Sequence, residues 1–152
     1  MVDVDTGLFT VAVFQNAAWA GKGLEALRQA GFPAEAISIL AKEGADASAL
    51  LAKSLGADGE RIEINSVGPV VARGRLLDAL QGSSKDLAKL GIAATMRRVG
   101  FQPHDGRIFE TLVGRGGVLV AIRSEPRAAD ALAILHSYGG GNAAIGAWTG
   151  RV

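Results

Sequence analysis

The segment PHDGR, at residues 103–107, is where the residue types of this chain come closest to a catalytic group. It places His104 beside Asp105, with Arg107 two residues further on. A histidine next to a carboxylate can act as a general base near neutral pH. However, neighbours in sequence rarely face one another productively, and a helix that starts here would use Pro, Asp and Gly in the same way. We therefore keep these three residues as candidates and assign none of them a catalytic role.

The other polar motifs predict neither a metal nor a cofactor. His136 corresponds to Arg28 in a repeated pattern described below, and we expect both side chains to face solvent. Two histidines without cysteines or a carboxylate cluster do not make a metal site. The glycine runs GRGG (114–117) and GGGN (139–142) do not lead from a strand into a helix, as a phosphate-binding loop does. We interpret them as helix ends.

The composition predicts a single folded domain in a reducing compartment. The chain has 152 residues, of which 49% are hydrophobic and 20% are charged, and it has no cysteine. This is enough apolar surface for one core, and it excludes disulfides, thiolate catalysis and cysteine-based metal sites. The N-terminal sequence MVDVDT is acidic and lacks the basic start of a signal peptide, and no apolar run reaches the length of a membrane span. We therefore expect a cytoplasmic protein.

The charged residues are unevenly distributed along the chain, although the net charge is only +1. Residues 1–60 carry four basic and eight acidic side chains, whereas residues 61–127 carry eleven basic and six acidic ones. Such an asymmetry can steer subunits together or attract an acidic partner. The alternative is an uneven scatter of surface charge, because a block of sequence need not form one surface patch.

A strand–helix–strand pattern occurs near both ends of the chain. In residues 7–40, the β-rich segment LFTVAVF leads into a helix that Asn16 can cap, Gly31 ends that helix, and AISIL resumes a strand. Residues 116–148 repeat this order with VLVAIR, a helix rich in alanine and leucine, a glycine run and AAIGAW. The pairs that match at a spacing of 108 residues are Leu24 and Leu132, Leu27 and Leu135, Gly31 and Gly139, and Ile37 and Ile145.

The repeated pattern predicts an α+β fold. Two β–α–β halves can place their strands in one antiparallel sheet with both helices on one face, which is the ferredoxin-like arrangement. Residues 41–115 are too long for a loop between the halves, and we expect a partly helical insertion there. Within it, the segment SSKDLAKLG predicts a helix with Leu87 and Leu90 on one apolar side. We treat residues 1–152 as one domain.

Five short stretches, which together span most of the chain, carry a family resemblance. They are VAVF with the helix after it, AGFPAEAISIL, LGI, FETLVGRGGVLVAI and ALAILHSYGG. They resemble a bacterial family, the general stress protein 17M or heat-induced stress protein domain. The resemblance implies a role in stress response, with no defined reaction.

The same resemblance raises the question of membrane contact. Members of the family generally have a glycine-rich apolar stretch in the middle of the chain. Here its place is taken by SVGPVVARGRLLDALQG, in which Arg73 and Arg75 would be costly inside a bilayer. We therefore do not expect membrane insertion, and we retain a peripheral contact through residues 66–80 as an alternative.

The leading hypothesis is a non-catalytic, stress-associated protein that acts through self-association or a protein partner. A four-stranded sheet with helices on one face leaves the other face open, and a second copy would remove that face from water. Phe9, Phe14 and Trp148 are the candidate interface residues, since aromatic side chains are enriched at interfaces.

A second hypothesis is a small-molecule enzyme or a ligand-binding domain. It predicts a pocket between the sheet and the insertion, to which His104 and Arg107 would contribute polar groups. Nucleic-acid binding is not expected, because the strand VLVAIR has no aromatic residue that could stack on bases.

Overall fold

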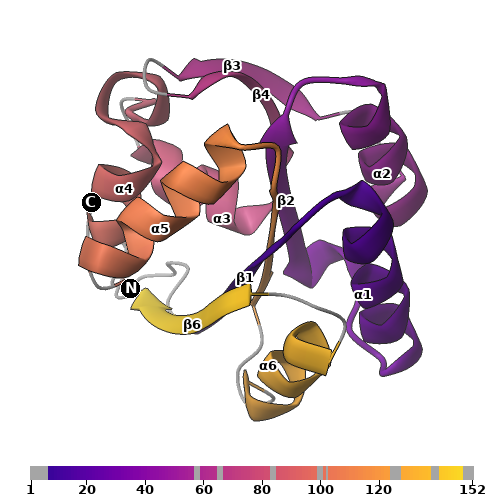
Figure 1. The fold of residues 1–152 in the computed structure, drawn as a ribbon. Coiled ribbons are helices and arrows are strands. Elements are labelled where there is room, and N and C mark those ends of the chain that lie inside the picture. The colour runs from indigo at the N-terminus through magenta and orange to yellow at the C-terminus, as the bar shows by residue number, and fades with distance from the viewer. Residues whose placement is uncertain are drawn as a thin grey trace.

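The computed structural model describes residues 7–56, 59–64, 67–82, 85–98, 101, 103–123, 128–137 and 141–148. Figure 1 shows their arrangement. The elements in chain order are β1 (Gly7–Phe14), α1 (Ala17–Gln29), the 3-10 turn η1 (Ala34–Ala36), β2 (Ile37–Lys42), α2 (Ala45–Leu55), β3 (Glu60–Ile64), β4 (Gly68–Arg73), α3 (Arg75–Gln81), α4 (Leu87–Arg98), α5 (Pro103–Gly114), β5 (Val118–Arg123), α6 (Ala128–Ser137) and β6 (Gly141–Trp148).

The described strands form one antiparallel sheet, in the order β3–β4–β2–β5–β1–β6. The strands from the two ends of the sequence lie side by side, with Val11 of β1 opposite Ala121 of β5. The prediction of a mixed α and β fold in which both ends share an antiparallel sheet is therefore confirmed. The insertion also contributes to this sheet, because β3 and β4 extend it beyond β2.

The sequence signals for the first helix act as predicted. The side chain of Asn16 accepts a hydrogen bond from the backbone N–H of Trp19 at 3.0 Å, which satisfies one free donor of the first turn. At the other end, Gly31 takes a left-handed conformation with φ of 96°, and the N–H of Phe32 donates to the carbonyl of Leu27 at 3.1 Å. Leu27 and its repeat partner Leu135 are both fully buried in the same apolar cluster.

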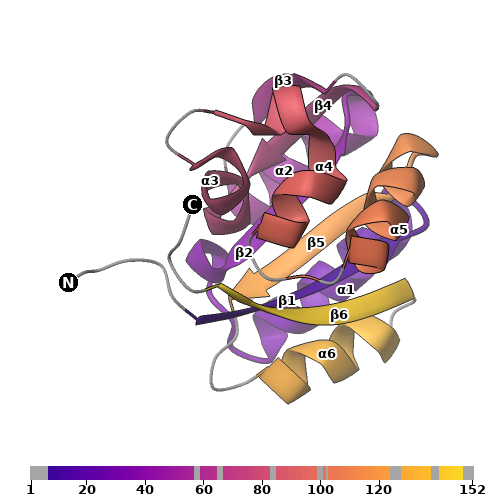
Figure 2. The ribbon, with the colours of Figure 1, turned by 90° about the vertical axis from the view of Figure 1, so that its left-hand side faces the viewer.

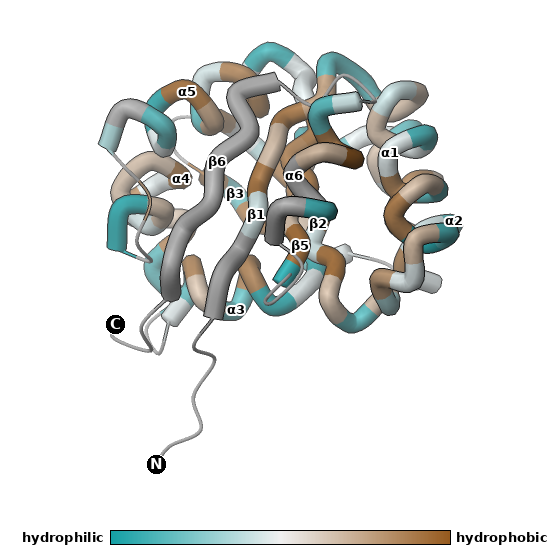
Figure 3. Tube along the Cα trace, turned by 90° about the horizontal axis from the view of Figure 1, so that it is seen from below, coloured by the Kyte–Doolittle hydropathy of each residue, from teal (hydrophilic) through white to brown (hydrophobic). Residues whose placement is uncertain are grey.

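Helices cover both faces of the sheet. Helices α1, α2 and α6 lie on one face, and α3, α4 and α5 lie on the other (Figures 1 and 3). Residues of β1 alternate between two apolar clusters: Val11 and Val13 pack with α3, α4 and α5, whereas Ala12 and Phe14 pack with α1, α2 and α6. The expectation of an open sheet face is therefore wrong. Because β1 and β5 are buried on both sides, the insertion has to cover the second face.

Neighbouring strands run in opposite directions, so two strands with one strand between them run in the same direction. Four connections join such pairs of strands. Three of them carry one α-helix over the same face: β1–α1–β2, β2–α2–β3 and β5–α6–β6. The fourth runs from β4 to β5 and carries α3, α4 and α5 over the opposite face, so that it has the opposite hand to the other three. The insertion thus adds two strands to the sheet and covers its second face with helices.

Helix α4 is interrupted at its centre. Gly91 has φ of 86°, outside the helical region, and the hydroxyl of Thr95 donates to the carbonyl of Gly91 at 2.8 Å. Leu87, before the interruption, is fully buried, whereas Leu90 is 53% exposed. The predicted apolar pair of Leu87 and Leu90 is therefore wrong for Leu90, because the chain changes direction at the next residue.

The apolar stretch considered for membrane contact lies inside the protein. Val70 and Leu76 are at most 1% exposed, and the other valines and leucines described within residues 66–80 are buried as well. The exposed side chains of this segment are Arg73, Arg75 and Asp78. In the part of the chain that the structure describes, no helix combines the length and the apolar character that crossing a membrane requires.

Candidate functional site

The three candidate catalytic residues lie in the first turns of α5, where the helix-start interpretation places them. Asp105 is half-buried and Arg107 is exposed, while the side chain of His104 lies outside the described residues. Gly106, between them, has a packing role: a Cβ atom there would lie 2.9 Å from the carbonyl oxygen of Ala93 in α4. The close crossing of α4 and α5 thus explains the glycine at this position (Figure 2).

The structure describes the side chain of only one of the three candidate interface residues, Phe14. Phe14 is fully buried against α1, so it cannot contact a partner, and its assignment to an interface is wrong. It faces inward because β1 is a central strand with helices on both sides. The side chains of Phe9 and Trp148 lie outside the described residues, and their backbones belong to β1 and β6.

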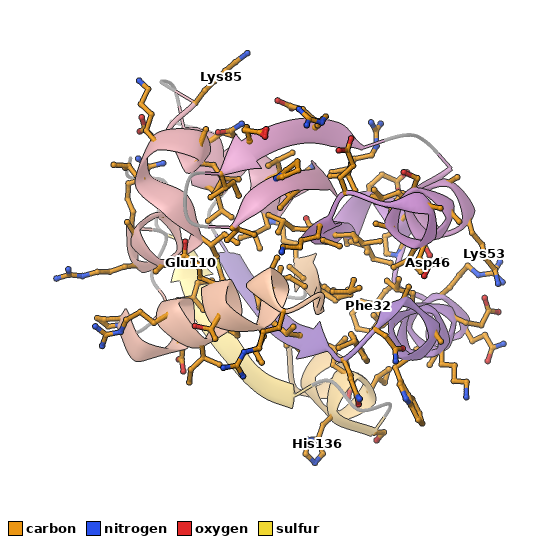
Figure 4. All side chains as sticks on the ribbon, turned by 45° about the horizontal axis from the view of Figure 1, so that its top comes forward. Phe32, Asp46, Lys53, Lys85, Glu110 and His136 are labelled. Atoms are coloured by element: carbon orange, nitrogen blue, oxygen red, sulfur yellow. The ribbon has the colours of Figure 1, made fainter. Side chains whose placement is uncertain are left out.

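His136 is exposed on α6, as predicted, and its repeat partner Arg28 is exposed on α1. Figure 4 shows the imidazole pointing away from the sheet. Among the described residues, no group of three or more His, Cys, Asp or Glu side chains is placed to hold a metal ion.

A groove of about 940 Å³ lies between α1 and α2. Its lining includes small residues of both helices, with Gly21 and Ala49 among them, and charged side chains at Lys22, Asp46 and Lys53. Figure 4 shows Asp46 and Lys53 projecting from α2. The sequence contained one signal for this groove that we did not use, namely alanine and glycine at exposed positions of two consecutive helices.

Two smaller cavities continue this groove toward one end of the sheet. The first, of about 170 Å³, shares Gly21 and Lys53 with the groove and extends to Phe32. The second, of about 470 Å³, shares Ile37 with the first. Its charged lining residues are Glu35, Glu60, Arg73, Arg75 and Asp78. These residues bring both signs of charge together where β2 begins and β4 ends.

The two edge strands of the sheet, β3 and β6, differ in their charge. At one end, β3 has the sequence ERIEI, and Arg61 donates to the carboxylate of Glu43 at 2.9 Å, which raises the pKa of Arg61. At the other end, β6 has the sequence GNAAIGAW, which contains no charged residue. Within the described residues, no strand pairs with the outer edge of β6 (Figure 2). This contrast is readable in the sequence only once the strand order is known.

Comparison of the chain with protein-family models, with curated proteins and with solved structures gave no match.

Proposed function

We propose that this is a non-catalytic, stress-associated cytoplasmic protein that acts by self-association, and that two copies pair through β6. The observation that carries the proposal is the contrast between the sheet ends. An uncharged strand of eight residues forms one edge, whereas Glu60, Arg61 and Glu63 occupy the other. Unpaired N–H and C=O groups of an edge strand accept a strand from another chain unless charge or proline prevents it.

Antiparallel pairing of β6 with β6 of a second copy fits a twofold axis, the commonest symmetry of soluble oligomers. It would continue the sheet across both copies.

The position of β6 also supports a ferredoxin-like core, which we propose as the finer description of the fold. The strands β2, β5, β1 and β6 have the order of that arrangement, with α1 and α6 on one face. The stress-related role rests on the resemblance stated above, and the cytoplasmic location rests on the cysteine-free sequence.

Light scattering after gel filtration tests the pairing. We expect the mass of a dimer at micromolar concentration, and a monomer throughout this range would contradict the proposal. In consecutive residues of a regular antiparallel strand, the N–H groups point alternately to one neighbour and to the other. Ala144 and Ala147 lie three positions apart in the part of β6 that pairs with β1 in regular register, so their N–H groups point in opposite directions. Of the variants Ala144→Pro and Ala147→Pro, we therefore expect one to lose pairing with β1 and to melt earlier. The other should keep the melting temperature and become monomeric, and Glu60→Ala at the opposite edge should remain dimeric.

A second candidate function is supported by the cavity of about 470 Å³. The space between the sheet and helices α3, α4 and α5 is filled by the core, so a pocket there is not available among the described residues. The cavity beside Arg73 and Arg75 instead lies where β2 begins and β4 ends, and its two guanidinium groups and three carboxylates suit a small molecule that carries both signs of charge. A thermal-shift screen of zwitterionic metabolites tests this: a ligand should raise the melting temperature of the natural protein but not that of Arg73→Ala.

A further inference from the structure

Among the described residues of α4, α5 and the connections beside them, the exposed ionisable side chains are all basic. In the described residues between 85 and 115, the exposed charged residues are Lys85, Lys89, Arg97, Arg107 and Arg115. Figure 4 shows Lys85 projecting into solvent. These five residues come from α4, α5 and the connections beside them, which pack together on one face of the sheet, and we call their exposed side the basic surface.

The carboxylates of the same segment are half-buried and engaged within the protein. Asp86 forms an ion pair with Arg98 at 2.7 Å, and Glu110 accepts a hydrogen bond from the backbone N–H of Ala93 at 3.4 Å. Asp105 is half-buried and has an interaction partner as well. A ligand that approaches α4 and α5 thus meets the lysines and arginines first.

The other helices do not share this property. On α3, the exposed Arg75 and Asp78 carry opposite charges. On α1, Glu25 pairs with Arg28 at 2.7 Å, and on α2 the exposed Asp46 and Lys53 carry opposite charges. The basic surface would therefore orient the molecule toward an anionic partner, with α4 and α5 facing it.

An exposed leucine lies within the basic surface. Leu90 is 53% exposed and lies next to Lys89. Trp19 and Leu90 are the two large apolar side chains with high exposure among the described residues. Basic side chains around an apolar one are typical of surfaces that bind anionic lipid, where the cations meet the headgroups and the apolar side chain enters the interface.

Single-stranded nucleic acid would be expected to use exposed aromatic rings on the same surface. The phenylalanines here, Phe101 and Phe109, are buried and pack edge to face at a centroid distance of 6.0 Å. The surface therefore supplies charge and a leucine but, in its described residues, no exposed ring for stacking.

We propose that the outer surface of α4 and α5 binds the anionic surface of a membrane peripherally. This contact is distinct from the one expected through residues 66–80, whose apolar side chains are buried. It does not depend on self-association, because each copy carries the whole surface.

Vesicle co-sedimentation of the full chain tests the proposal. The vesicles are phosphatidylcholine with about one third phosphatidylserine, compared with phosphatidylcholine alone. We expect binding to the anionic vesicles, at least a tenfold loss of affinity between about 0.05 M and about 0.5 M NaCl, and no binding to neutral vesicles. Absence of binding at the low salt concentration would overturn the proposal.

Matched variants locate the contact. Each basic residue near an anionic membrane contributes about 1 kcal/mol, so Lys89→Gln and Arg97→Gln should each weaken binding about fivefold. Lys42→Gln, an exposed lysine at the end of β2, should leave binding unchanged. Leu90→Asn should weaken binding while the salt dependence stays the same. Circular dichroism checks that each variant is folded.

A measurement of RNA binding distinguishes lipid from nucleic acid as the anionic ligand of this surface. Fluorescence anisotropy with a single-stranded and a double-stranded RNA should show weaker binding than the anionic vesicles give, at equal salt. Tight RNA binding that Lys89→Gln reduces and Leu90→Asn leaves intact would assign the surface to nucleic-acid phosphates and would contradict the lipid proposal. Equal losses from Lys42→Gln and Lys89→Gln would also contradict it, because binding would then follow net charge alone.

Discussion

Arg98 is the residue whose removal tests most directly how the insertion is held together. It lies at the end of α4, where its Nη1 atom is 2.7 Å from the carboxylate of Asp86 and its Nη2 atom donates to the carbonyl of Leu80 at 2.7 Å. One side chain thus joins the end of α3, the connection to α4 and α4 itself. Both partners of the ion pair are largely shielded, with 22% and 23% of their side chains exposed.

The expected cost of removing Arg98 follows from these contacts. A hydrogen bond to a charged group contributes about 1.5–3 kcal/mol, and partial exposure reduces this, so that two such bonds contribute about 2–3 kcal/mol here. An opposing term comes from the Nε atom, which is buried and has no hydrogen-bond partner among the described residues. Arg98→Met keeps the aliphatic stem and removes that orphaned atom, so we expect it to lower the free energy of unfolding by about 1–2 kcal/mol.

Urea denaturation of Arg98→Met, Asp86→Ala and the double variant measures these energies. We expect the double variant to be less destabilised than the sum of the two single ones, with a coupling of about 1 kcal/mol between the partners. Lys85→Ala, an exposed neighbour in the same connection, serves as the control and should change stability little. A fall of less than about 0.5 kcal/mol in Arg98→Met, or additive effects in the cycle, would show that the ion pair does not hold α3 and α4 together.

Two further predictions concern α1. Gly21→Ala should raise the free energy of unfolding by about 0.5–1 kcal/mol, because alanine is the better helix former and the new Cβ would meet its nearest neighbour at an ordinary 3.7 Å. Gly23→Ala should instead lower it by about 1–3 kcal/mol, because its Cβ would lie 2.6 Å from the buried ring of Phe14; equal effects in thermal denaturation would contradict this account. The hydrogen bond from Arg28 lowers the pKa of Glu25 below 4.5, so Glu25→Gln should be slightly less stable than the natural protein at neutral pH. That difference should vanish as the pH falls through the folded pKa, and a difference that persisted or grew in acid would contradict the pairing.

The basic surface could be predicted only in part from the sequence. The basic surface combines the sequence excess of lysine and arginine in residues 61–127 with the partial burial of Asp86, Asp105 and Glu110. Composition supplies the excess, but only packing shows which charges remain at the surface. The exposure of Leu90 was missed for a similar reason, because helical periodicity assumes a straight helix and α4 is interrupted at Gly91.

The sequence by itself determined the local elements at both ends of the chain. Cap residues, apolar spacing and glycine positions act over a few residues, so Asn16 and Gly31 bound α1 without reference to the rest of the fold.

Only the tertiary structure decided the strand order and the side of the sheet that the insertion covers. These depend on contacts between residues far apart in the chain. Examples are the pairing of β4 with β2 and the packing of Phe109 in one cluster with residues of β1 and β5. A local pattern of apolar residues states that a face must be buried, but it does not specify which part of the chain buries it. For this reason the expected open face became a core, and a strand edge took its place as the candidate surface for association.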